Sequence, residues 1–136
     1  MTEAIQTLFD RAREAAAEGR PTDARNAWAQ AASLGREAGT PLLRAHALRH
    51  LSDLDREAGR PVEALAHAKQ AVALYRRHAG ADDLDLTNAL RLMALALDDL
   101  GRGATATALW IEARDRYAAA GIAAGIAECA ARLEAV

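Results

Sequence analysis

The chain is poor in cysteine, lysine and aromatic residues, with one cysteine, one lysine and five aromatic side chains among 136 residues. The single cysteine, Cys129, excludes an internal disulfide and fits a reducing compartment. The longest stretch without charge, residues 117–127, is too short to cross a membrane. The amino-terminal residues include acids where a secretory signal would have a basic and then an apolar run. We therefore expect a cytoplasmic protein with no membrane partner.

Basic residues are not in excess, because 17 lysines and arginines stand against 19 aspartates and glutamates. The resulting net charge of −2 removes the electrostatic basis for general nucleic-acid binding. Hydrophobic residues make up 51% and charged residues 26% of the chain, which is typical of a folded globular domain. Alanine forms roughly a quarter of the sequence and β-branched residues are scarce, so we expect a single all-α domain over residues 1–136.

One short phrase occurs three times, as GRPTDAR at 19–25, GRPVEAL at 59–65 and GRGATAT at 101–107. The runs that follow close with alanine–glycine pairs at 38–39, 79–80 and 120–121, with a spacing of 41 residues each time. Self-similarity at a nearly fixed period is the signature of repeat architectures. The repeating unit is therefore predicted to be helix, short turn, helix, short turn.

Turn and cap residues predict seven helices, at roughly 2–18, 22–38, 41–58, 62–79, 83–100, 104–120 and 122–135. Thr40 followed by proline, and the acids Asp82 and Asp83, favour helix starts. Glycine at the end of a run favours a C-terminal cap, which we expect at Gly19, Gly39, Gly59, Gly80, Gly101 and Gly121. The first six helices would form three antiparallel hairpins, about 2–38, 41–79 and 83–120, and helix 122–135 would cap the stack.

Small and large residues keep fixed places within these units. The first helices have a small residue at Ala12, Ser52 and Ala94 and a large one at Leu8, Leu48 and Leu90. The second helices have alanine at Ala24, Ala64 and Ala106, and again at Ala31, Ala71 and Ala113. Small residues at fixed places let two helix backbones approach closely. We expect these positions to form the core, with Cys129 facing the preceding hairpin as a small hydrophobe.

The same positions resemble the tetratricopeptide repeat, whose second helix contains alanine and, four residues on, an aromatic residue. Leu90-x-x-Met93-Ala94-x-x-Leu97 matches its first helix, and Ala24-x-x-x-Trp28 and Ala106-x-x-x-Trp110 match its second. Residues 75–102 are most similar to the longer repeats of kinesin light chains, which suit the 42-residue step from Gly59 to Gly101. Asp55 departs from the family, which prefers an aromatic residue there. The resemblance implies a right-handed α-solenoid of three hairpins plus a capping helix.

The sequence contains no pattern that predicts catalysis, and we expect neither an enzyme nor a cofactor. His46-x-x-x-His50 places two imidazoles on one helix face, a spacing that can chelate a metal. Asp53 is the only further candidate ligand on that face, and the glutamate of a zinc-protease motif is absent. We therefore expect a solvated or groove-lining pair, with a metal- or ligand-dependent sensor as the alternative. His67 is expected at the surface.

In tetratricopeptide-like stacks the first helices line a concave face, where ligands bind. The resemblance therefore implies a peptide-binding face composed of Arg13, His46, Arg49, His50, Asp53, Asn88, Arg91, Leu92 and Leu95. Arg49 and Arg91 occupy equivalent places and would offer paired donors to carboxylates. Leu92 and Leu95 would be apolar anchors facing the groove. We expect a protein or peptide partner with acidic and apolar anchors.

Two other interpretations of this face remain open. In the first, the face is solvated and each arginine pairs with an acid along its own helix, as the spacing of Arg49 and Asp53 allows. Alternatively, exposed apolar residues of helix 83–100 would mediate self-association. We expect a monomer or a weak homodimer with no bound nucleic acid.

Overall fold

A computed structural model describes residues 1–78, 80 and 83–135. Within these residues the chain forms seven helices and no strand. The helices are α1 (Thr2–Ala17), α2 (Pro21–Ala38), α3 (Pro41–Glu57), α4 (Pro61–His78), α5 (Leu84–Asp99), α6 (Gly103–Ala120) and α7 (Ala123–Glu134). Each boundary agrees with its predicted position to within one residue. Ala79 and Asp82, expected at a helix end and a helix start, lie outside the described residues.

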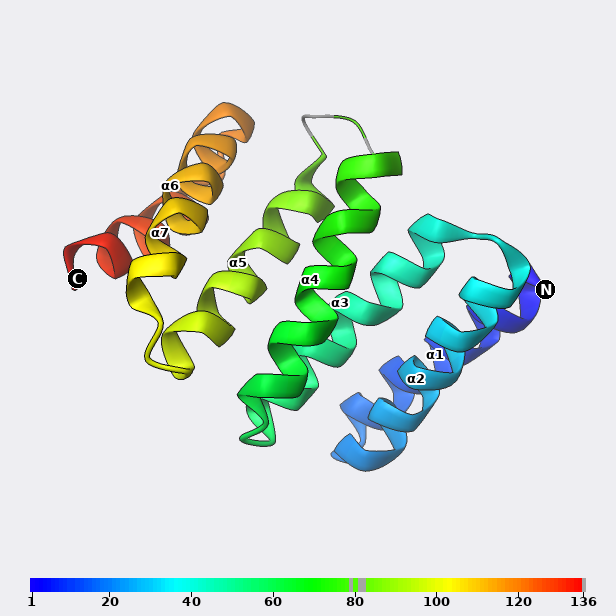
Figure 1. Cartoon of the computed structure of the whole chain (residues 1–136). Coiled ribbons are helices and arrows are strands. Elements are labelled where there is room, and N and C mark those ends of the chain that lie inside the picture. Colours follow the sequence, from blue (N-terminus) through cyan, green and yellow to red (C-terminus); the bar gives the residue numbers. More distant parts are fainter. Residues whose placement is uncertain (79, 81–82, 136) are drawn as a thin grey trace.

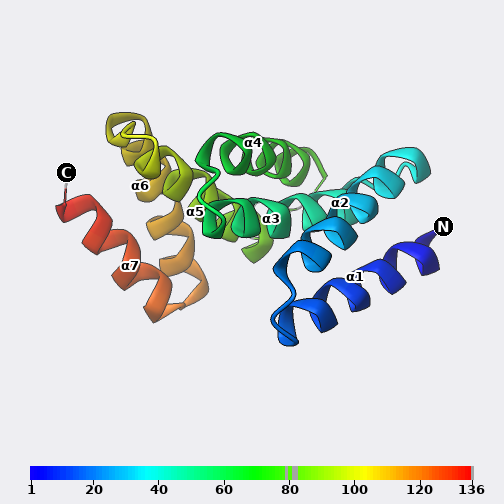
Figure 2. The same cartoon turned by 90° about the horizontal axis from the view of Figure 1, so that it is seen from below.

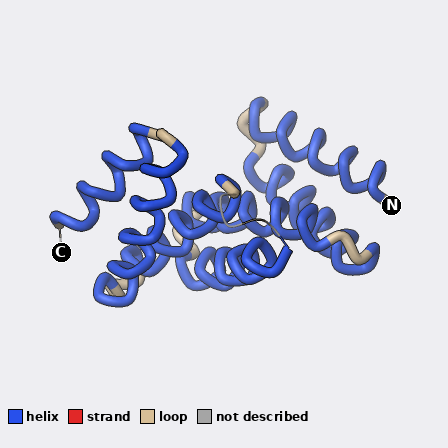
Figure 3. Tube along the Cα trace, turned by 90° about the horizontal axis from the view of Figure 1, so that it is seen from above, coloured by secondary structure: helices blue, strands red, loops and turns tan. Residues whose placement is uncertain are grey.

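Each helix packs against the one before it and the one after it, which is consistent with a helical repeat. The stack is curved, with the amino and carboxyl ends of the chain at its two extremities (Figure 1). Seen from below, α1, α3, α5 and α7 form the inner layer, and α2, α4 and α6 form the outer layer (Figure 2). The opposite view shows the same opening between the first and last helices (Figure 3).

The glycine caps explain how the chain reverses between helices. Gly39 ends α2 with φ of 66°, and its amide donates to the carbonyl of Arg36. Five of the six expected caps have φ in the left-handed region, but Gly80 does not, so that expectation was wrong there. Asp83 caps the start of α5, as predicted, because its carboxylate accepts the backbone N–H of Asp85 at 2.7 Å.

The positions predicted for the core are buried. All six alanines at the two equivalent places of α2, α4 and α6 are fully buried, as are Ala12 and Ala94. Leu8, Leu48 and Leu90 fill the matching places of α1, α3 and α5. Four residues after the first of these alanines, α2 and α6 have the buried residues Trp28 and Trp110, and α4 has the buried Ala68 at the equivalent place. Cys129 has no exposed surface, which confirms the prediction that it packs inward.

The last helix, α7, approaches α6 very closely at Gly125. A Cβ built on Gly125 would lie 2.5 Å from Cγ of Tyr117, the ring that α6 presents to α7. The tyrosine ring is itself buried, so it has little space into which to retreat. The absence of a side chain at Gly125 therefore allows α7 to pack closely against α6.

We expect Gly125→Ala to lower the free energy of unfolding by about 2 kcal/mol, because overpacking a well-filled contact forces backbone shifts. The displaced helix should expose Cys129, whose reaction with a thiol reagent would accelerate. Urea unfolding and the modification rate measure the two effects.

Gly103→Ala is the matched control, because its Cβ would meet only Asp98 Oδ1 at 3.8 Å, an ordinary contact. If Gly125→Ala behaved like this control in both assays, the close approach of α6 and α7 would be incorrect.

A buried ionic cluster joins three consecutive helices. The Asp55 carboxylate of α3 is fully buried and accepts from Arg25 Nε of α2 at 2.7 Å. His67 of α4 contacts the other carboxylate oxygen through Nδ1, also at 2.7 Å. His67 was expected at the surface, but only 23% of its side chain is exposed. The expectation was wrong because its partner, Asp55, belongs to another helix.

Candidate functional site

Six of the nine residues predicted for the binding face line one hollow of about 290 Å³ on the inner layer. They are Arg49, His50, Asp53, Asn88, Arg91 and Leu92, from α3 and α5. Asp53 follows Arg49 by four residues and His50 by three, so it shares one side of α3 with both. On α5, Asn88 precedes Arg91 and Leu92 by three and four residues, so these three also share one side of their helix. The hollow therefore lies where two neighbouring inner helices face each other.

A second hollow of about 390 Å³ continues the first toward α7. Asn88 and Arg91 line both hollows, and the others lining the second are Tyr117, Ile122, Ala124, Gly125 and Glu128. The Tyr117 hydroxyl donates to Asn88 Oδ1 at 2.6 Å, which fixes the amide at the border between them. We call the two hollows together the inner groove. It extends from α3 across α5 to α7.

His46 and His50 pack in a ring cluster beside the inner groove. The His50 ring stacks on Trp28 with centroids 4.2 Å apart and planes inclined by 7°. His46 contacts both Phe9, at 4.9 Å, and His50, at 4.7 Å between centroids. This cluster joins α1 and α2 to α3, and the two imidazoles are partly buried rather than solvated.

Burial and nearby cations keep both imidazoles neutral. Desolvation, followed by the charges of Arg49 and Arg13, lowers the pKa of His46 to about 4. Desolvation, followed by His46, lowers the pKa of His50 to about 3. Arg13 Nη2 lies 3.4 Å from Nε2 of His46, and Arg49 Nη2 lies 3.2 Å from Nδ1. A neutral imidazole accepts at one nitrogen only, so His46 can bind one of these two guanidinium groups at a time.

The arginines of the groove already have acidic partners from other helices. Two N–H groups of Arg91, on Nε and Nη2, donate to the Glu128 carboxylate of α7, with Nη2 at 2.9 Å from Oε2. This contact, together with the charge of Arg91, holds the pKa of Glu128 below its usual range. Arg49 lies 3.6 Å from Asp85 of α5. The predicted pair of Arg49 with Asp53 along α3 does not form, because these partners lie on neighbouring helices.

Leu92 and Leu95 are not the exposed anchors that the sequence predicted. Leu92 is 6% exposed and only borders the groove, while Leu95 is 1% exposed and belongs to the core. The reason is the position of α5, which packs against α3 as well as α4 and α6. A central helix with neighbours on three sides buries apolar residues that an isolated amphipathic helix would expose. Leu95 is therefore removed from the candidate site.

In the described part of the chain, no three His, Cys, Asp or Glu side chains are grouped so as to hold a metal ion. His46 and His50 are adjacent, but both nitrogens of His46 face guanidinium groups. A cation bound there would have to displace Arg13 or Arg49. The pair is better described as part of a packed ring cluster.

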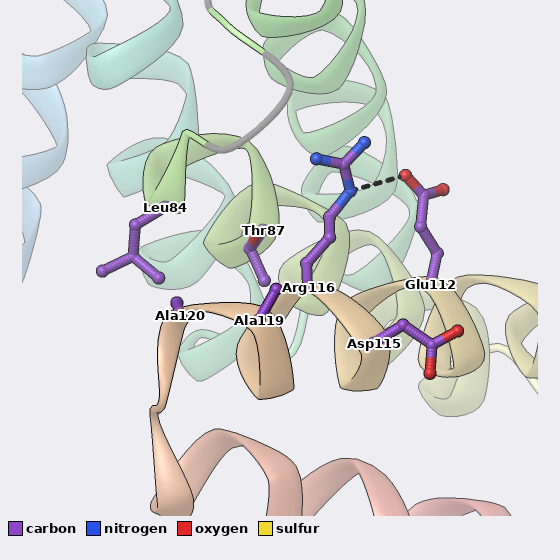
Figure 4. Close-up of a pocket in the computed structure, with 7 residues that line it drawn as sticks. All are labelled: Leu84, Thr87, Glu112, Asp115, Arg116, Ala119 and Ala120. Carbon is purple, nitrogen blue, oxygen red and sulfur yellow. Dashed lines mark hydrogen bonds and ion pairs between the residues drawn. The ribbon is translucent and has the colours of Figure 1, made fainter.

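A hollow that the sequence did not indicate lies between the start of α5 and the end of α6, with a volume of about 380 Å³. Leu84 lies over Ala120 on its apolar side, and Arg116 reaches Glu112 on the other (Figure 4). Arg76 also binds Glu112, at 2.6 and 3.0 Å, and these contacts lower the pKa of that carboxyl group. Because these charged groups compensate one another, the hollow offers a ligand few specific contacts.

No helix among the described residues combines the length and apolar character needed to cross a bilayer. Comparison with models of known protein families and with curated protein sequences gives no match. What this chain binds is therefore inferred from its own residues and their geometry.

Proposed function

We propose that this chain is a non-enzymatic protein-interaction module that binds a peptide or a helix in the inner groove. In this proposal the seven helices are a right-handed, tetratricopeptide-like solenoid of three hairpins, and α7 caps it. The observation that carries the proposal is the meeting of six predicted residues from α3 and α5 in one hollow that continues to α7. Two linked hollows along three helices suit an elongated ligand better than a compact one.

The chemistry of the groove supports a peptide as the ligand. Asn88 sits at the border of the two hollows, and its carbonyl oxygen is already engaged by Tyr117. Its amide N–H groups are the complementary donors for a backbone carbonyl of a bound peptide. The ring cluster behind His50 gives this side of the groove a fixed wall. A preorganised wall lowers the entropic cost of binding.

A replacement that fills the groove tests this function. We expect Asn88→Trp to block both hollows, because residue 88 lines each of them. Peptides selected from a random display library on the whole wild-type chain should lose at least about tenfold in affinity for this variant. Isothermal titration calorimetry measures the affinity, and circular dichroism checks that the variant remains helical.

Val62→Trp is the control, since Val62 is 64% exposed on α4, in the outer layer. The selected peptides should bind this control as they bind the wild type. Peptides that bind both variants equally would place the binding surface outside the groove. If light scattering showed concentration-dependent dimers and selection gave no peptide, self-association would replace the proposed function. Zinc affinity that depended on His46 would favour the sensor instead.

A further inference from the structure

We propose that the ligand of the inner groove is anchored by a cationic group, an arginine or lysine side chain, at the carboxylate of Asp53. This inference rests on the proposed function and deepens it, because it names the chemistry of the partner. It also reverses the sequence-based expectation of an acidic ligand. Three features of the groove support it.

The first feature is the balance of charge around the hollow. Arg91 is bound by Glu128, and Arg49 lies against Asp85, so both lining arginines have carboxylate partners. Asp53 lines the same hollow, and no basic group among the described residues lies within 4 Å of its carboxylate. Among these five groups, Arg91 and Arg49 form ion pairs with Glu128 and Asp85, and Asp53 is the one carboxylate without an ion pair, although it attracts Arg91 at longer range. A cation neutralises Asp53 without breaking an existing ion pair.

The second feature is the surface next to Asp53. His50 precedes it on the same side of α3 and lines the same hollow. One face of the His50 ring is stacked on Trp28, and this contact holds the ring in place. A guanidinium or ammonium group would thus meet a carboxylate and the edge of a fixed, uncharged ring cluster together. A carboxylate ligand would meet the same ring and the charge of Asp53, which repels it.

The third feature is that, among the equivalent positions of α1, α3 and α5, only that of α3 is occupied by an acid. The positions equivalent to Asp53 in the neighbouring units are Arg13 on α1 and Leu95 on α5. Arg13 is exposed at the far side of the ring cluster, and Leu95 is buried. The arrangement therefore predicts one specific position for a basic residue of the ligand rather than a ladder of contacts.

Peptide selection followed by a double-mutant cycle tests this inference. Random peptides are selected from a display library on the whole chain, as wild type and as Asp53→Lys. Peptides from the wild type should share an arginine or lysine at one position, and peptides from Asp53→Lys should carry an acid there. Glu63→Lys makes the same charge change at an exposed residue of α4 and should leave the wild-type preference unchanged.

One selected peptide is then studied with two changes. Asp53→Asn in the protein should weaken its binding about tenfold, and replacing the basic residue of the peptide with glutamine should weaken binding to a similar extent. The two changes together should cost little more than either alone, because both remove the same contact. Additive losses, or a shared acidic position in peptides selected on the wild type, would overturn the inference. If those peptides still bind less tightly to Asn88→Trp, the proposed function survives that failure. If no peptide is sensitive to Asn88→Trp, the proposed function and the cationic anchor both fail.

Discussion

Replacing Asp55 with alanine is expected to lower the free energy of unfolding by about 3 kcal/mol, and the melting temperature by about 10 °C. The Asp55 carboxylate is fully buried and joins Arg25 of α2 to His67 of α4. Its removal leaves a cavity and two groups that have lost their partner in a partly desolvated place. This loss lies near the lower end of the range that is typical for removing one partner of a buried ion pair, because 30% of the Arg25 side chain and 23% of the His67 side chain are exposed.

The next sequence unit shows which residues would replace this cluster without loss. The positions equivalent to Arg25, Asp55 and His67 are Leu65, Leu97 and Leu109. Leu65 and Leu97 are buried, and Leu109 packs against the same core. A hydrophobic set of suitable volume commonly matches or exceeds the stability of a buried ionic set. We therefore expect the variant in which Arg25, Asp55 and His67 are all replaced with leucine to have a free energy of unfolding within about 1 kcal/mol of that of the wild type.

Urea unfolding of the single and triple variants at pH 7 measures both effects. Asp99→Ala is the matched control, because Asp99 accepts from Arg56 at 2.7 Å at a more exposed place on the surface. Asp99→Ala should lower the free energy of unfolding by less than about 1 kcal/mol. A loss for Asp55→Ala as small as for Asp99→Ala would show that the buried cluster is not closed in solution.

The helices could be predicted from the sequence because their signals are local. The phrase beginning Gly-Arg, the alanine–glycine closures and the proline after Thr40 each act within a few residues, and the helix ends follow them. Gly80 is the exception, and there the cap of the next helix is supplied by Asp83. The core alanines were equally predictable, because they recur at fixed places in each unit.

The candidate site was predictable only in part. The spacing along α3 brought Arg49, His50 and Asp53 to one face, and the equivalence of the units added Asn88 and Arg91 from α5. The ion-pair partners were not predictable, because they come from other helices and their contacts depend on the curvature of the stack. Leu95 was misplaced for the same reason, since a helix with neighbours on three sides has little exposed face.

Acidification from pH 7 to pH 5 is expected to lower the free energy of unfolding by about 3 kcal/mol through His46 and His50. In the unfolded chain both imidazoles titrate near their ordinary pKa of 6.5, whereas in the folded protein the pKa of His46 is about 4 and that of His50 about 3. Between these values the unfolded state binds more protons than the folded state. The contribution of the two imidazoles to the free energy of unfolding is therefore fully present above about pH 7, and it falls as the pH drops from 6.5 toward 4.

The groups around the two rings account for this resistance to protonation. Arg13 of α1 and Arg49 of α3 repel a proton on either ring, and Asp85 of α5 only partly offsets them at His46. Phe9 and Trp28 enclose the rings and remove water. Protonation in the folded state would therefore place a new cation between two guanidinium groups. Separation of α1 and α2 from α3 would relieve this repulsion.

A variant that copies the third unit removes both titrating rings. The positions equivalent to His46 and His50 in that unit are Asn88 and Leu92, so the variant is His46→Asn with His50→Leu. Urea unfolding at pH 7, 6 and 5 should show the fall in stability for the wild type and less than about 1 kcal/mol of change for the variant. His67 and His78 remain in both proteins and cancel in the difference. The acids whose pKa is lowered, Glu112 and Glu128, lose their contribution only below this range. Equal slopes for the two proteins would mean that the imidazoles are already protonated in the folded state at pH 5, and that Phe9 and Trp28 do not enclose them in solution.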